Sequence, residues 1–192
     1  MPLIMGILAQ AAAAPVAAGA YDLLETQTLG TAVASVTFTG LDTLAAGYQH
    51  LQLRMTARST FAVDAVYNAD LIFNGDSGSN YSFHQLLGNG SSVTSTSGTS
   101  ASSITLPNWI PGSSTTSNAF GGMVMDILDF SSTSKNTTIR TLAGATTSGQ
   151  SEVVMHSGLY ISTDAVTSLA ISSSVANLDT GSRFSLYGIR AV

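Results

Sequence analysis

The sequence predicts an all-β fold: an antiparallel, jelly-roll-like β-sandwich with an extended apolar N-terminal arm. Segments that alternate apolar and polar residues with the period of a strand recur at even spacing along the chain. Turn residues separate several of them, and no helical pattern alternates with them as it would in an α/β protein. About ten such segments favour a jelly roll over a seven-stranded immunoglobulin type, whose usual cysteine pair is also missing.

Residues 1–20 form the predicted arm, and residues 21–192 the predicted β-sandwich domain. The arm looks like a secretory signal, but it lacks a positively charged start, and Pro2 and Gly6 interrupt it, so we do not expect a signal peptide. It is also too short and too interrupted for a membrane-spanning helix. Its apolar side chains need cover from water, either as an extra edge strand on their own sandwich or docked on another subunit. We expect a subunit contact made by Pro2, Leu3, Ile4, Met5, Ile7 and Leu8.

The expected strands follow in chain order. Residues 22–29 and 34–39 form the first pair, with Gly30 in the turn between them. Residues 48–58 show the clearest alternation, with odd-numbered side chains inward and even-numbered ones outward (Leu51, Leu53, Met55 and Ala57 against His50, Gln52, Arg54, Thr56 and Arg58). The tract 88–103, rich in Ser, Thr and Gly, is expected to interrupt the series. The other expected strands are residues 66–73, 81–87, 120–130, 137–143, 153–161, 168–173 and 183–190.

The composition favours a protein that is covered by neighbours. Hydrophobic residues make up 44% of the chain and charged residues only 9%, against a typical charged share of roughly 25%. So few charges protect a lone soluble monomer poorly. The net charge of −5 and the six scattered basic residues exclude a basic patch, so we expect no nucleic-acid partner. The absence of cysteine excludes disulfides and cysteine-based metal sites.

One loop carries the most site-like pattern. Residues 75–79 read Gly-Asp-Ser-Gly-Ser and resemble the nucleophile segment of trypsin-like serine proteases. Such an enzyme needs a histidine base and a buried aspartate, but the only upstream histidine is His50, on a strand position that faces solvent. The same stretch offers oxygen ligands for Ca²⁺, although the spacing does not match an EF-hand. A polar turn between strands is the favoured interpretation.

The remaining candidates also favour a protein without catalytic, cofactor-binding or metal residues. His50, His84 and His156 share no metal-ligand spacing and are expected at the surface or an interface. Asp126 and Asp129 lie three residues apart on an expected strand and would point to opposite faces, so they cannot clasp one sugar linkage. The sole tryptophan, between two prolines at residues 107 and 111, is either a loop platform or a plug at the end of the sandwich.

Five segments can be compared with known proteins: Tyr21-Asp22-Leu23-Leu24-Glu25-Thr26, Ser35-Val36-Thr37-Phe38, Tyr48-Gln49-His50-Leu51-Gln52-Leu53-Arg54, Phe73-Asn74-Gly75-Asp76-Ser77-Gly78-Ser79-Asn80-Tyr81 and Phe184-Ser185-Leu186-Tyr187-Gly188-Ile189. In this order they resemble small virion structural proteins of tailed bacteriophages, of the capsid cement or tail-fibre type. The resemblance covers residues 21 to 189 and leaves out the arm and the Ser/Thr tract. It implies a β-sandwich that commonly assembles as a trimer, and it implies no catalytic residues.

We therefore expect a non-enzymatic structural protein located in the virion and assembled in the host cytoplasm. A capsid cement or decoration protein that stabilises the shell is the leading hypothesis. A tail-fibre or tail-associated receptor-binding protein is the alternative, and a carbohydrate-binding or hydrolytic jelly roll is a further one. The expected partners are further copies of the chain, in a trimer, and the major capsid protein or other virion subunits. No cofactor, nucleic acid or membrane is expected.

Overall fold

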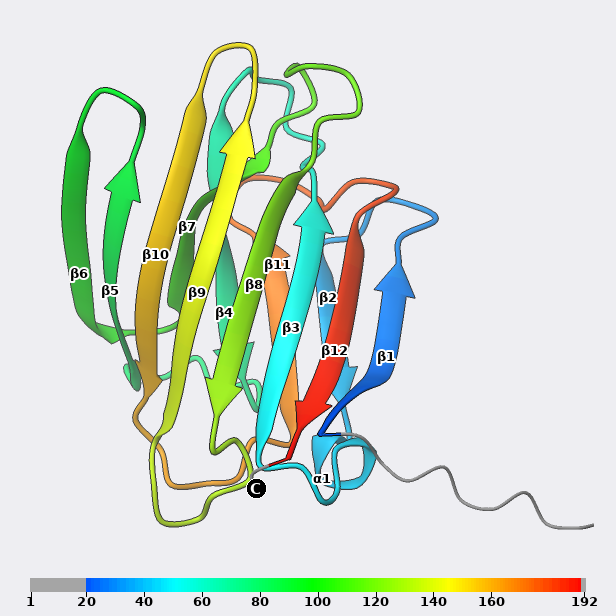
Figure 1. Ribbon diagram of the computed structural model, residues 1–192, viewed down its shortest axis with the longest axis vertical. Coiled ribbons are helices and arrows are strands. Elements are labelled where there is room, and N and C mark those ends of the chain that lie inside the picture. Colours follow the sequence, from blue (N-terminus) through cyan, green and yellow to red (C-terminus); the bar gives the residue numbers. More distant parts are fainter. Residues whose placement is uncertain (1–19, 191–192) are drawn as a thin grey trace, which may run out of the picture.

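The computed structural model describes residues 20–190 as an antiparallel β-sandwich (Figure 1). The large sheet has eight strands in the order β1-β12-β3-β8-β9-β10-β5-β6, and the small sheet has four in the order β2-β11-β4-β7. The elements are β1 (Tyr21–Thr28), β2 (Ser35–Thr39), α1 (Leu41–Leu44), β3 (His50–Ala57), β4 (Val66–Phe73), β5 (Tyr81–Gly88), β6 (Val93–Ala101), β7 (Ile104–Pro111), β8 (Gly121–Leu128), β9 (Thr137–Thr146), β10 (Ser151–Tyr160), β11 (Ser168–Ser173) and β12 (Arg183–Ile189).

The connections between the sheets are those of a jelly roll, as the sequence predicted. The chain passes from β2 in the small sheet to β3 in the large one, back to β4, and across again to the β5–β6 hairpin. It returns for β7, crosses to the β8–β9–β10 meander, and comes back for β11. This crossing pattern is that of an eight-stranded jelly roll in which a meander replaces one strand. Strands β1 and β12 widen the large sheet beyond this frame.

All the strands expected from alternation are present, and two more lie where none was expected. The tract 88–103 was predicted to interrupt the strands, but it contains β6, and β7 follows at once. Strand β6 forms one of the two edges of the large sheet. Most of its side chains are exposed, so its sequence shows no apolar face from which a strand could be predicted. Strand β7 contains two prolines and lies at the edge of the small sheet, where proline is tolerated.

The core lies between the two sheets and is filled by aromatic and aliphatic side chains. The inward positions predicted for β3 are confirmed, because Leu51, Leu53, Met55 and Ala57 are all buried. Trp109 of β7 is fully buried, so it fills the sandwich and offers no platform to a ligand. The largest fully buried side chains besides it are Tyr81, Phe38, Phe73, Phe130 and Phe184.

The outward position predicted for Arg58 is wrong. The residue follows the end of β3, is only 7% exposed, and turns its guanidinium toward the loop before β8. Its Nη1 donates to the carbonyls of Thr116 and Ala119, at 2.9 Å each, and its Nη2 donates to the carbonyl of Ser113 at 2.8 Å. A buried guanidinium needs such acceptors, and here they are carbonyls of a loop that has no ladder partners of its own.

Candidate interaction surface

Strand β10 places its side chains against the usual rule for a half-buried strand. Glu152 and His156 point into the sandwich and are 6% and 4% exposed, whereas Val153 and Met155 point outward and are each 60% exposed. An antiparallel sheet with one solvated face normally does the opposite. Departures from a local rule of this kind concentrate at functional sites. The outward face of the large sheet, here called the open face, is therefore the candidate site; Figure 1 looks onto it, with the small sheet behind.

A row of apolar side chains crosses the open face. Strand register places Leu86 of β5 beside Met155 of β10, Met155 beside Leu142 of β9, and Leu142 beside Val124 of β8. These four side chains, here called the apolar ridge, are 49%, 60%, 58% and 40% exposed in that order. Single exposed hydrophobic residues are normal on any protein, but a contiguous row is typical of an interaction site.

A trough floored by Gly144 and Gly122 runs along one side of the ridge. The next register row holds Gly88 of β5, Val153 of β10, Gly144 of β9 and Gly122 of β8. A groove of about 660 Å³ follows the Gly144 and Gly122 part of this row, and Arg183 of β12 is among its lining residues. The trough is thus a hollow between aliphatic side chains and an arginine.

A polar row flanks the ridge on its other side. The carboxylate of Asp126 accepts hydrogen bonds from Nε2 of Gln52 (2.8 Å) and Nε of Arg140 (3.0 Å), and His84 and Ser157 continue the row. A second groove, of about 630 Å³, lies between this row and the ridge. Because the carboxylate and the guanidinium neutralise each other, the ridge is bordered here by a satisfied polar network.

An aromatic pair ends the polar row at the β1 edge of the sheet. The rings of Tyr21 and Tyr187 stack with their centres 4.9 Å apart, and the guanidinium carbon of Arg54 lies 5.3 Å and 5.1 Å from these centres. Nε of Arg54 and the hydroxyl of Tyr21 both donate to Oε1 of Gln52. Partial burial raises the pKa of Tyr21, so its hydroxyl keeps the proton that it donates.

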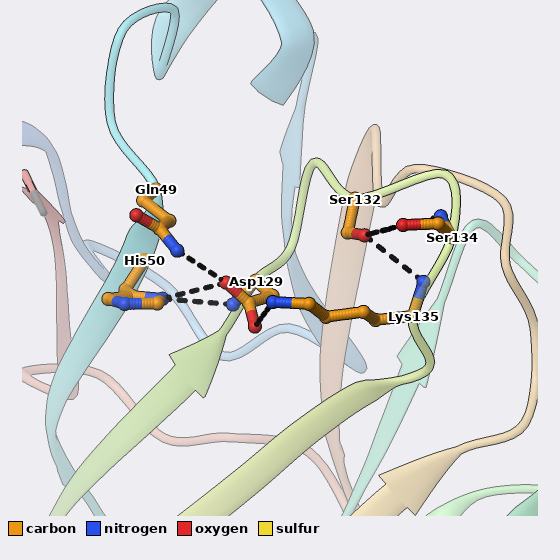
Figure 2. A network of polar contacts seen from close by, with 6 residues as sticks. All are labelled: Gln49, His50, Asp129, Ser132, Ser134 and Lys135. Carbon is orange, nitrogen blue, oxygen red and sulfur yellow. Dashed lines mark hydrogen bonds and ion pairs between the residues drawn. The ribbon is translucent and has the colours of Figure 1, made fainter.

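A polar cluster joins the ends of β3 and β8 (Figure 2). The carboxylate of Asp129 accepts hydrogen bonds from Nε2 of Gln49 (2.8 Å) and Nζ of Lys135 (3.0 Å), and these two donors lower its pKa. Nδ1 of His50 accepts the backbone N–H of Asp129 at 2.9 Å. A nitrogen that accepts a hydrogen bond has no proton to give to the carboxylate, so Asp129 does not orient His50 as the aspartate of a catalytic triad would.

The loop with the protease-like pattern is a closed polar turn. Asp76 accepts hydrogen bonds from the N–H of Gly78 (2.8 Å), Nδ2 of Asn80 (2.8 Å) and the hydroxyl of Tyr160 (3.1 Å). The Asn80 and Gly78 bonds lower the pKa of Asp76. Within residues 20–190, no hydrogen bond joins Ser77 to a histidine. N–H donors around a carboxylate stabilise a turn, whereas a Ca²⁺ site would gather oxygen atoms.

Of the remaining residues that the sequence suggested as sites, those that the structure describes do not come together in one place. The arm residues Pro2, Leu3, Ile4, Met5, Ile7 and Leu8 lie outside the described residues. Asp126 lies on the open face, and Asp129 lies past the end of β8 with different partners. Among residues 20–190, no group of three or more acidic or histidine side chains is gathered as a metal site would require. Within the same residues, no helix has the length and hydrophobicity needed to cross a membrane.

All three histidines were predicted at the surface or an interface, and this prediction is wrong for His156. His84 lies exposed on the open face and His50 is half-buried, but His156 is buried beneath β7 with Phe83 stacked on its ring at 5.7 Å. Its position follows from the phase of β10, which Val154 fixes by pointing into the core. The exposed ridge was missed for the same reason. The sequence gives no signal for this phase, because Glu152 and His156 flank a continuous apolar run, Val153-Val154-Met155.

Comparisons with known proteins add no relative: no family model, no curated protein and no solved structure matches the chain.

Proposed function

We propose that the chain is a structural subunit of a tailed-phage particle, a capsid cement protein that assembles with other virion subunits through the open face. The observation that carries the proposal is β10, which buries Glu152 and His156 while it exposes Val153 and Met155. A subunit that met only water would normally carry polar side chains at the outward positions of Val153 and Met155. An exposed ridge of this kind is stable in an assembly, where a neighbour covers it.

Three further properties support a structural role. The chain is only 9% charged, which suits a surface that is partly covered. The jelly roll is a fold that viral capsid and lectin domains use repeatedly, which favours the proposal by analogy. In the polar cluster, Asp129 and His50 tie the ends of β3 and β8 together.

The experiment is a count of copies in purified particles of the phage whose genome encodes this chain, by quantitative mass spectrometry against a tail protein and the major capsid protein. We expect copies in proportion to the capsid lattice, hundreds per particle. A few copies per particle would overturn the cement role in favour of the tail, and complete absence from particles would overturn the virion role.

A tail-associated receptor-binding role is the second candidate, because one observation favours it. The Tyr21–Tyr187 stack lies beside Gln52, Arg54 and Asp126 on the open face. Aromatic rings next to amide and charged groups are the combination that binds sugar rings by stacking and hydrogen bonds. A receptor-binding role predicts the other outcome of the copy count, only a few copies per particle.

A further inference from the structure

Within residues 20–190, nothing covers the apolar ridge and its trough, yet the chain carries a segment of matching chemistry. We propose that the N-terminal arm of one copy lies in the glycine trough of a neighbouring copy, against the apolar ridge, so that copies are linked by exchanged arms. The inference deepens the proposed function and rests on it, because it names the partner that the open face meets in the assembly.

The arm has the composition of a segment that is covered on both sides. Residues 1–21 contain no charged side chain, and residues 2–8 are apolar except for Gly6. Strands that read as continuous hydrophobic runs are buried on both faces, whereas strands on a solvated face alternate. An arm folded onto its own open face would leave one side in water. An arm held between two copies is covered on both sides, so we assign it to the neighbour.

The glycines of the trough point to an outside partner. A Cβ at Gly122 would meet no atom within 4 Å, and Gly122 does not have a positive φ. The fold of the subunit therefore does not require glycine at this position, although it does at Gly144, where a Cβ would lie 2.8 Å from the carbonyl oxygen of Glu152. Glycine inside a strand commonly marks a place where another backbone approaches closely.

The reach of the arm fits an exchange. The backbone enters the sheet at Ala20, whose carbonyl accepts the N–H of Arg190 at 3.0 Å, and the Tyr21 ring already lies on the open face. Residues 9–19 can span about 36 Å when extended, whereas the trough begins about 14 Å from the β1 edge, three strand spacings away. The connecting segment is long enough to leave its own subunit.

Arg183, at the end of the trough, has a guanidinium group that can donate hydrogen bonds. An extended segment that crosses strands cannot join their ladder, so its carbonyls need other donors. Arg183 lies in the same register row as Gly122 and Gly144, separated from them by Thr56. Its guanidinium makes no hydrogen bond or ion pair within residues 20–190, and it can donate to the carbonyls of the arm.

Cysteine trapping tests the exchange directly, because the chain has no cysteine of its own. Full-length Ile4→Cys and Gly122→Cys variants with different tags are mixed and oxidised. We expect a disulfide-linked heterodimer of the two variants. The control replaces Gly122→Cys with Ala170→Cys, on the outward side of β11 in the small sheet, and should give only background. Equal yields with the two partners would overturn the proposal, and so would a double variant, carrying Ile4→Cys and Gly122→Cys in one chain, that forms its disulfide only within single chains.

A blocking variant gives the second readout. Gly122→Val fills the trough in the full-length chain, and the empty space around it and the strand preference of valine keep the subunit folded. Sedimentation velocity should show self-association weakened at least ten-fold, while Ala170→Val leaves it unchanged. Unaltered self-association of a folded Gly122→Val protein would overturn the proposal. Purified protein that exchanges arms but is absent from particles would keep this inference and remove the proposed function, and the reverse result would do the opposite.

Discussion

His156 is a buried histidine whose ring nitrogens make no hydrogen bond of normal geometry within the described residues, although the backbone of Thr105 lies near. Burial lowers its pKa to about 4, with a small contribution from His84 in the same direction and an opposing one from the backbone of Thr105. The unfolded chain has an ordinary histidine pKa near 6.5, so it binds more protons than the folded one between these values. The contribution of neutral His156 to the free energy of unfolding is therefore complete above about pH 6.5, and it is lost as the pH falls toward 4.

We predict that His156→Phe removes this acid sensitivity. A phenyl ring fits the stack on Phe83 and leaves no buried nitrogen unpaired, so the free energy of unfolding at pH 7 should be equal or higher. Between pH 7 and pH 4 the variant should lose about 3 kcal/mol less than the parent, the equivalent of the pKa shift. Urea unfolding across this range measures it, with the exposed His84→Gln as control. A parent and variant with parallel curves would contradict the prediction.

Single residues also show where the alternation of the sequence predicts orientation and where it fails. For β3 the rule places every core side chain correctly, because aliphatic residues there have no competing role. It fails at Arg58, since loop carbonyls far along the chain satisfy the buried guanidinium. At β10 the sequence offers no alternation to follow, because Val153, Val154 and Met155 form a continuous apolar run, and contacts with β7 fix the phase. Neither cause is local in sequence.

Strand β8 contains two neighbouring glycines, of which one is required by close packing and the other is not. A Cβ at Gly121 would lie 1.5 Å from the carbonyl oxygen of Trp109, where β7 passes beneath, whereas a Cβ at Gly122 would meet nothing within 4 Å. We predict that Gly121→Ala destabilises the fold by at least about 3 kcal/mol, because a backbone carbonyl cannot move aside. Gly122→Ala, the matched control one residue away, should change stability by less than about 1 kcal/mol and in the favourable direction. Thermal or chemical unfolding of the two variants measures both changes in stability. A small loss of stability in Gly121→Ala would mean that the two sheets are less closely packed here.

The elements that sequence could and could not predict differ in what stabilises them. Strands that pack one face on the core can be predicted from their alternating apolar side chains, as β3 and β8 can. The edge strand β6 is stabilised by its ladder with β5 and shows only Ser, Thr and Gly side chains around Val93 and Ala101. The glycine trough is harder still to predict, because Gly122 and Gly144 come together only through the register of β8 and β9. Sequence supplies the glycines, and only tertiary pairing aligns them.

At the scale of the whole molecule, we expect the open face to govern self-association in solution. Covering the ridge side chains, each about half exposed, would contribute on the order of 5 kcal/mol before the cost of association. That is comparable with the total stability of a small domain, about 5–15 kcal/mol. Folding and assembly should therefore be linked, and the apparent stability should depend on protein concentration.

We predict that the midpoint of thermal unfolding rises by about 2–4 °C for each ten-fold increase in concentration, the shift that mass action gives a self-associating protein of this size. Leu142→Thr combined with Met155→Thr should abolish the dependence, because both side chains lie on the ridge and threonine suits an exposed strand. At the lowest concentration the variant should melt with the parent, since neither side chain is part of the core. Ile72→Thr, on the outward side of β4 in the small sheet, is the matched control and should keep the concentration dependence. A midpoint that is independent of concentration in the parent would mean that the ridge is tolerated in water, and the open face would then lose its claim to be the surface of assembly.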